Sequence, residues 1–231
     1  MIIPLLNAQP LSDWVMTTVS DGMWLFEGHL PRDAGFLVGD TVDLQIDTTQ
    51  PPTQADVFSY GDGGDGRWRV VLYPHGALQL LLPCTPTFLS NPSIDTLMNT
   101  LAPGVSWSLT PDAVINFSQD NLYLSSQETG LQALRSYLTL QGTTFRVDLS
   151  GTFWIGRAPT QILIGDWKYV TYNASSKLMT VGIFKDSFEI PIGSTLFSAV
   201  VDYVHYVCDG LGIAAVCRVI GTPKQPIPER S

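Results

Sequence analysis

Apolar and polar residues alternate with a period of two along much of the chain. In residues 41–47, Val42, Leu44 and Ile46 fall on one face, and polar residues fall on the other. This period is typical of a β-strand with one buried face. We predict further strands in the apolar segments that turn residues bound, which are 23–30, 67–73, 77–82, 143–149, 152–156, 167–173, 177–184, 198–208 and 212–220.

Turn-forming residues between these segments predict how the strands connect. Pro74-His75-Gly76 separates 67–73 from 77–82, and an Asp-Gly turn separates the last two strands. Short connections of this kind favour antiparallel hairpins. The strands do not alternate with long helices, so a doubly wound α/β fold is disfavoured. The fold class we predict is mainly β, an antiparallel β-barrel or sandwich with one or two short helices.

Two segments show helical signals instead. In the first, residues 91–104, Ser93 is placed as an N-cap and Pro103-Gly104 as a stop, with apolar residues at 94, 97, 98 and 101. In the second, residues 125–138, Ser125 and Glu128 match a capping box. Leucines 131, 134 and 138 then fall on one side. Gly130 weakens this second helix.

The chain shows no fixed repeat and no long internal linker, so we predict one β-rich domain over residues 1–221. Residues 222–231 contain three prolines, which favours an extended proline-rich C-terminal tail. The opening segment is apolar and also carries a proline. We interpret both ends as those of a domain taken from a longer polypeptide.

Composition narrows the function classes. Only 14% of the 231 residues are charged, and 39 Ser and Thr outnumber the 33 charged side chains. A surface wetted by hydroxyls is more typical of β-rich extracellular or viral coat modules than of cytosolic helical enzymes. The net charge of −9 argues against nucleic acid as a partner. Charged residues interrupt the most apolar window, 197–221, so we expect no membrane insertion.

Three cysteines, Cys84, Cys208 and Cys217, exclude a disulfide-dense scaffold. Cys208 and Cys217 could face each other across a hairpin. The interpretation that we favour is that all three are buried free thiols.

A glycine-rich stretch, residues 58–68, is the most unusual feature of the sequence. It lacks the ligand spacing of an EF-hand calcium loop, and a strand rather than a helix follows it, unlike a phosphate-binding loop. We therefore expect an exposed, flexible connection between two strands. It could be purely structural. The alternative is a surface-recognition loop, for which the candidate residues are Tyr60, Asp62, Asp65 and Trp68.

Catalytic signatures are weak. His29, His75 and His205 are far apart in sequence, and no serine lies in a nucleophile-elbow motif. The strand around His205 favours a packed, hydrogen-bonded histidine over a metal ligand. We expect no catalytic residues, no cofactor, no metal and no enzymatic activity. Two carboxylates could still meet in space as a glycosidase pair, but the sequence selects no such pair.

Four segments resemble the capsid spike domain of astroviruses. They are IIPLLNAQPLSDW, DGMWLFEGHL, TVDLQID and RWRVVLYPHGALQL, which together span the first third of the chain. The resemblance implies an antiparallel barrel-type core, a homodimer, and a location on the virion surface as part of the capsid. It also implies attachment to a host-cell receptor and recognition by neutralising antibodies.

The function expected from the sequence is therefore that of a non-enzymatic viral capsid spike domain that mediates host-cell attachment and presents antibody epitopes. The alternative is a carbohydrate-binding or carbohydrate-active β-sandwich, such as a lectin, an adhesin or a glycosidase-like protein. A deep cleft with two carboxylates would favour hydrolysis, whereas a convex surface of loops would favour attachment.

Overall fold

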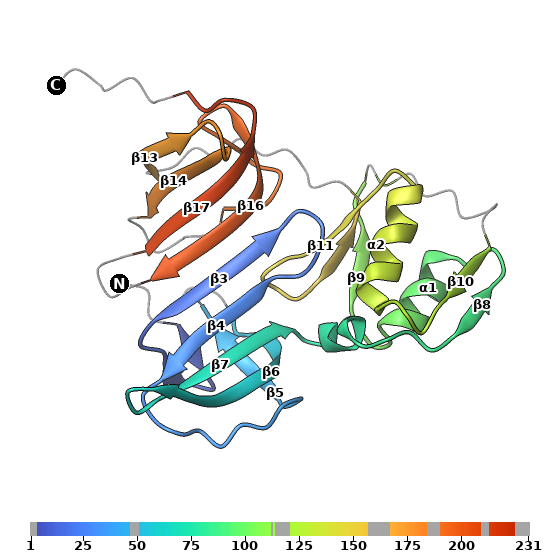
Figure 1. Ribbon diagram of the computed structural model, residues 1–231, viewed down its shortest axis with the longest axis horizontal. Helices are drawn as coiled ribbons and strands as arrows, with labels where there is room; N and C mark the ends of the chain where they lie inside the picture. Colours follow the sequence, from blue (N-terminus) through green and yellow to red (C-terminus); the bar gives the residue numbers. More distant parts are fainter. Residues whose placement is uncertain are drawn as a thin grey trace.

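One long antiparallel sheet is the main element of the fold (Figure 1). The computed structural model describes residues 4–46, 51–111, 113, 121–156, 167–183, 190–208 and 213–224. Within these residues the strand order is β13-β14-β17-β16-β3-β4-β7-β6-β5-β1-β2, and β15 pairs with β16 beside this path. The N-terminal strand β3 thus lies next to the C-terminal strand β16, so the two ends of the sequence share one sheet (Figure 1).

The strands of this sheet vary from two to twelve residues in length. From the N-terminus they are β1 (Leu5–Leu6), β2 (Gln9–Pro10), β3 (Trp14–Val19), β4 (Leu25–Leu30), β5 (Thr41–Gln45), β6 (Thr53–Gly64), β7 (Arg67–Pro74), β13 (Trp167–Asn173), β14 (Leu178–Ile183), β15 (Thr195–Leu196), β16 (Ala199–Cys208) and β17 (Ile213–Ile220).

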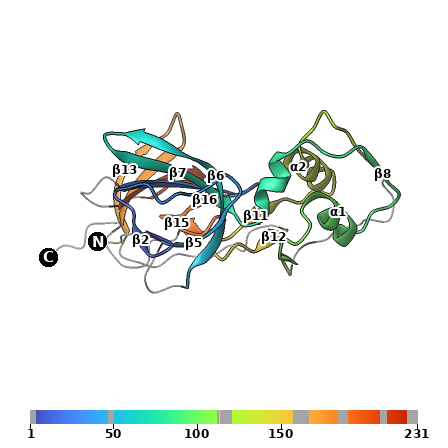
Figure 2. The same ribbon diagram turned by 90° about the horizontal axis from the view of Figure 1, so that it is seen from below.

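A second lobe carries the helices and two small sheets (Figures 1 and 2). It contains η1 (Ala77–Leu81), β8 (Thr87–Leu89), α1 (Ile94–Leu101), β10 (Leu122–Leu124) and α2 (Gly130–Leu140). One of the two small sheets pairs β8 with β10. The other has three strands, β9 (Trp107–Leu109), β11 (Phe145–Val147) and β12 (Phe153–Ile155), and in it β9 and β12 are parallel. The predicted class, mainly β with antiparallel sheets and two short α-helices, is confirmed; the arrangement is sandwich-like and not a closed barrel.

Nine of the ten predicted segments form strands, whereas β3 and the twelve-residue β6 were not predicted. Alternation was informative where one face of the long sheet is buried. Val42, Leu44 and Ile46 are buried, whereas Thr41 and Asp43 are exposed. The predicted hairpins 143–149 with 152–156, 167–173 with 177–184 and 198–208 with 212–220 correspond to the pairs β11–β12, β13–β14 and β16–β17. The Asp-Gly turn at 209–210 lies outside the described residues.

The predicted strand 77–82 is wrong, because these residues form the 3₁₀-helix η1. Gly76 takes a left-handed conformation, with φ of 75°, and its N–H donates to Asp56 Oδ2 at 2.7 Å. These features turn the chain away from the sheet after β7. Ala77 and Leu80 are buried while Leu82 is exposed, so the apolar run packs with a helical spacing. β7 pairs with β4 and β6 instead of with 77–82.

Local capping defines both α-helices. As predicted, Ser93 caps α1, where its Oγ accepts from Thr96 N, and the predicted apolar face is buried. The start predicted for the second helix is wrong, because α2 begins at Gly130 and its capping box is formed by Thr129 and Gln132. Ser125 and Glu128 close a separate turn before it, in which Ser125 N donates to Glu128 Oε1.

The two lobes share one continuous hydrophobic core. At their junction, Gly22 N donates to Phe145 O and Val147 N donates to Gly22 O, so the β3–β4 connection extends the three-stranded sheet. The buried Trp24 ring reaches across as well, and its Nε1 donates to Asp148 O at 3.0 Å. The division into a domain at 1–221 and a tail at 222–231 stays a prediction, and residues 225–231 lie outside the described residues.

All three cysteines are buried free thiols, as the favoured interpretation predicted. Burial raises the pKa of the Cys217 thiol to about 12. Because the thiolate is the reactive form and the folded-state pKa is raised, Cys217 stays a neutral thiol at ordinary alkaline pH.

We expect iodoacetamide at about pH 8, near the ordinary thiol pKa, to leave Cys217 unmodified in the native chain and to modify it fully in denaturant. Peptide mapping by mass spectrometry measures both. Rapid native labelling of Cys217 would contradict the placement of its strand in the core.

Candidate interaction surface

The glycine-rich stretch is a tight hairpin rather than a long connection. Strands β6 and β7 continue to Gly64 and Arg67, and only Asp65 and Gly66 form the turn. Both turn residues have positive φ, 53° and 73°, as a type I′ turn requires. A Cβ on Gly63 would lie only 3.0 Å from the His29 ring, so the glycine lets β6 pass close to that side chain. The predicted exposed connection between two strands is confirmed, but it is a turn of two residues; its flexibility stays a prediction.

The structure separates the four predicted recognition residues into two pairs. The Tyr60 and Trp68 rings stack at 5.1 Å between centroids, and both are partly buried against the core. Asp62 and Asp65 are exposed near the turn, where Asp62 Oδ1 accepts from Gly64 N. The aromatic pair therefore supports the hairpin, while the carboxylates face solvent. The recognition role of these residues stays a prediction.

Tyr60 also anchors a loop that the sequence analysis did not identify, residues 31–40. Its hydroxyl donates to Asp33 Oδ1 at 2.7 Å and accepts from Ala34 N at 2.6 Å. The Phe36 ring meets the Tyr60 ring edge-on at 5.4 Å. Burial raises the pKa of the Tyr60 hydroxyl, and the hydrogen bond from Tyr60 holds the pKa of the Asp33 carboxyl below its ordinary value. The loop is thus tied to the hairpin by polar and aromatic contacts.

The same loop presents apolar side chains to solvent. Leu37 and Val38 are 69% and 68% exposed, and Phe58 on the adjoining strand β6 is 47% exposed. A register shift between Val57 and Ser59 accompanies the outward position of Phe58. In the sequence, the signal was the apolar run Phe36-Leu37-Val38 between Gly35 and Gly39, which resembles neither an alternating strand nor a polar loop.

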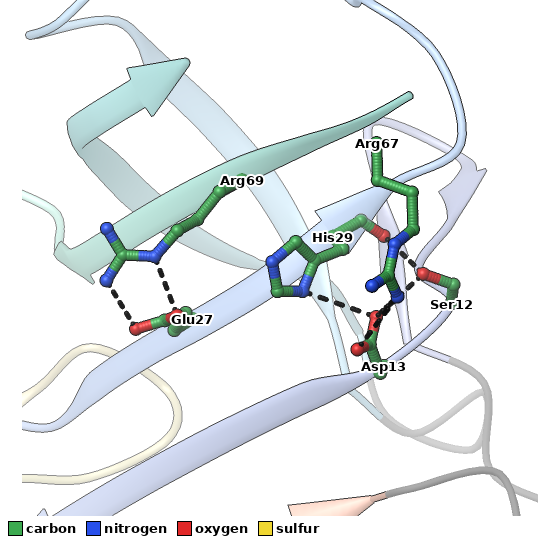
Figure 3. A network of polar contacts seen from close by, with 6 residues as sticks. All are labelled: Ser12, Asp13, Glu27, His29, Arg67 and Arg69. Atoms are coloured by element: carbon green, nitrogen blue, oxygen red, sulfur yellow. Dashed lines mark hydrogen bonds and ion pairs between the residues drawn. The ribbon is translucent and has the colours of Figure 1, made fainter. Parts of the chain in front are cut away.

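Ion pairs link strand β7 of the hairpin to strand β4 and to the residues just before β3 (Figure 3). Arg69 donates from Nε and Nη2 to the two carboxylate oxygens of Glu27, each at 2.7 Å. This bond lowers the pKa of the Glu27 carboxyl below 4.5 and raises that of Arg69. Because the folded-state pKa is lowered, the pair stabilises the fold above about pH 4.5 and loses that effect as the pH falls through the folded-state value.

A second group of these contacts contains Ser12, Asp13, His29 and Arg67 (Figure 3). Arg67 Nη1 donates to both oxygens of Asp13, at 3.1 and 3.2 Å, and His29 Nδ1 lies 3.3 Å from Asp13 Oδ1. Ser12 Oγ donates to Asp13 Oδ1 and to the His29 carbonyl. The serine hydroxyl therefore bonds to a carboxylate and not to the imidazole that would activate it as a nucleophile.

The other histidines have structural contacts. His205 Nδ1 lies 2.9 Å from Thr17 Oγ1 on the neighbouring strand, which agrees with a packed, hydrogen-bonded histidine. His75 Nδ1 lies 2.7 Å from Asp56 Oδ1. Among the described residues, no three His, Cys, Asp or Glu side chains are grouped to hold a metal ion. In that part of the chain, no helix combines the length and apolar character needed to cross a membrane.

Comparisons with known proteins identify the fold. No protein-family model matches the chain, and no curated protein is similar in sequence. A solved structure of the 43 kDa tail protein of prophage MuSo2 from Shewanella oneidensis is similar, with a TM-score of 0.66, 10% identity and coverage of 95% of this chain and 97% of that one. The tail protein from Neisseria meningitidis MC58 gives a TM-score of 0.67 at 11% identity, with 94% and 95% coverage.

Secretion-system proteins have similar structures too. The E. coli c3393 protein, a component of the type VI secretion system that is structurally similar to the T4 bacteriophage tail proteins gp27 and gp5, gives a TM-score of 0.57 at 9% identity, with 98% and 77% coverage. A Francisella PdpA–VgrG complex gives 0.51 at 9% identity, covering all of this chain and 60% of that one. At such identities the likeness shows the fold, and it shows that neighbours in this fold occur in protein complexes.

The resemblance to astrovirus capsid spikes is wrong. The solved structures that share the fold are phage tail and secretion-system proteins, so host attachment, antibody presentation and a location on a capsid surface are not supported. The carbohydrate-related alternative is not supported either. The resemblance depended on strand pattern and chain length, which many β-folds share, whereas the order of strands in the long sheet depends on contacts far apart in sequence.

Proposed function

We propose that this chain is a structural subunit of a phage-tail-like or type VI-like assembly, and that it acts through protein contacts without catalysis. The observation that carries the proposal is the fold, which two phage tail proteins share over at least 94% of both chains. The c3393 protein adds a link between this fold and a secretion apparatus. Fold alone does not fix function, so surface features of this chain have to agree with the proposal.

The surface features do agree with a role in protein contacts. Loop 31–40 carries solvent-facing apolar side chains and is held in place by hydrogen bonds, which is typical of an interaction surface. In the Ser12–Asp13–His29 group, the hydroxyl is engaged by a carboxylate. Neither arrangement supplies an activated nucleophile.

Protein partners follow from the same proposal, because a chain of similar structure occurs in a complex of PdpA and VgrG. Self-association of the chain as a homodimer, which the sequence analysis expected, remains part of the proposal. Light scattering of the purified chain measures it directly. A mass of only 25.3 kDa at micromolar concentration would remove the homodimer.

The proposal is tested in cells that encode the chain. Tail-like or secretion particles are purified by gradient centrifugation, and the chain is quantified against the most abundant particle protein by mass spectrometry. We expect it to sediment with the particles at a fixed stoichiometry, while an unrelated soluble protein of similar abundance stays at the top. Absence of the chain from particles that are otherwise complete would overturn the proposal.

A further inference from the structure

We propose that the tip of loop 31–40 inserts into an apolar groove, bordered by Lys or Arg, on a different protein subunit of the same assembly. The inference rests on the proposed function and names the surface and the kind of partner that this function requires. The tip is defined as residues 35–39, with Leu37 and Val38 at its apex. In Figure 1 the loop runs along the lower edge of the long sheet, from the end of β4 to the start of β5.

The apex is apolar in a place where solvent-facing loops are normally polar. Leu37 and Val38 leave more than two thirds of their surface in water. Gly39 N donates to Val57 O at 2.8 Å, which joins the C-terminal side of the tip to strand β6. Two adjacent aliphatic side chains at the apex of one loop, with charged residues on both sides, suit a contact with another protein.

The loop is held in one conformation before any partner binds. Leu37 N donates to Asp40 Oδ2 at 2.8 Å, and Val57 N donates to Asp40 O at 2.9 Å. At the other end of the loop, Gly35 N donates to Asp33 Oδ1, which also accepts from Tyr60. A preordered loop loses little conformational entropy on association, so its apolar apex contributes more of its burial to affinity.

Charge around the apex selects the partner. Asp33 and Asp40 flank the tip in the sequence, and both are exposed. Arg32 is the one cation within 31–40, whereas Arg67 and Arg69 on the hairpin are paired with Asp13 and Glu27. The apex is therefore bordered by negative charge on a chain whose net charge is −9. Like charge disfavours a second copy of this chain, and a groove with cationic borders complements the rim.

The partner is identified by photo-crosslinking in the assembled particle. The full chain carries p-benzoylphenylalanine at position 38, and a matched chain carries it at position 140, where Leu140 is 79% exposed in the other lobe. We expect position 38 to crosslink to a different particle subunit, at apolar residues that have Lys or Arg beside them. A crosslink to a second copy of this chain, or none above the level at position 140, overturns the inference.

Two variants separate the apolar and the charged contributions. The double variant Leu37→Ser/Val38→Ser should reduce incorporation into particles by about tenfold or more, because two buried aliphatic contacts are lost. Leu140→Ser should incorporate normally. The variant Asp33→Asn keeps an acceptor oxygen for Gly35 N and should reduce incorporation a few-fold, less at high salt. Normal incorporation of the double serine variant excludes the apolar insertion, and an unchanged or increased level for Asp33→Asn excludes the cationic border.

The outcomes also distinguish this inference from the proposed function. If the chain is present in particles but position 38 gives no specific crosslink, the proposed function stands and the docking site is wrong. If the chain is absent from particles, both are wrong. Thermal unfolding of each purified variant confirms that it is folded, which is expected because the replaced side chains are exposed.

Discussion

Replacing Gly156 by alanine is expected to lower the free energy of unfolding by about 2–5 kcal/mol, from backbone strain together with overpacking. Gly156 follows β12 with φ of 126°, a conformation that residues with a Cβ rarely adopt. A Cβ at this position would overlap Thr110 Oγ1 and lie 3.0 Å from Ala113 Cβ. Thr110 is buried and its N–H donates to Ile155 O, so it is poorly able to move aside.

A matched variant separates the two causes. Gly142 also has positive φ, 67°, but a Cβ there would meet nothing within 4 Å. Gly142→Ala should therefore cost only about 1 kcal/mol, the strain of a left-handed residue. Denaturant unfolding followed by circular dichroism measures both. Equal losses for the two variants would contradict the close packing of β12 against Thr110.

Replacing Asp56 by alanine is expected to cost about 2–4 kcal/mol, because hydrogen bonds to a buried charged group are lost and a donor is left without its acceptor. The Asp56 carboxylate is buried in β6 and accepts from Thr41 Oγ1 at 3.0 Å, His75 Nδ1 at 2.7 Å and Gly76 N at 2.7 Å. These contacts join β5, β6 and the start of η1. Their loss should destabilise the turn between β7 and η1, where the chain leaves the long sheet.

Asp56→Asn is the matched control for this prediction. It keeps the shape and one acceptor oxygen, but its NH2 group faces a donor. We therefore expect its free energy of unfolding to lie between those of the wild type and the alanine variant. Urea unfolding gives the two differences, and amide exchange at residues 76–80 reports the local effect. An alanine variant as stable as the wild type would mean that Asp56 does not fix this turn.

Local patterns predicted the strands whose two faces differ. The alternation in 41–47 and the turn residues between later strands were sufficient because one face of the long sheet is buried and the other is not. Ser93 was found as an N-cap for the same local reason. The segment 77–82 was misassigned because a run of leucines is compatible with a buried strand or helix, and the acceptor that turns the chain, Asp56, lies 20 residues before Gly76.

The candidate site was only partly predictable. Tyr60 and Trp68 were selected for their position beside the glycine-rich turn, but their stacking and their contact with the loop at 31–40 depend on pairing across three strands. The exposed apex at Leu37 and Val38 could have been noticed as an apolar run between glycines. The capsid assignment failed because strand pattern does not determine strand order, and strand order distinguishes this fold.

The central claim is that this chain is a β-rich subunit that acts by contact through the tip of loop 31–40. Cryo-electron microscopy of particles purified from the encoding cells tests it most directly. We predict density for the long sheet within the assembly, with Leu37 and Val38 seated against a different subunit. Complete particles that lack this density, or particles in which residues 31–40 face open solvent, would contradict the claim.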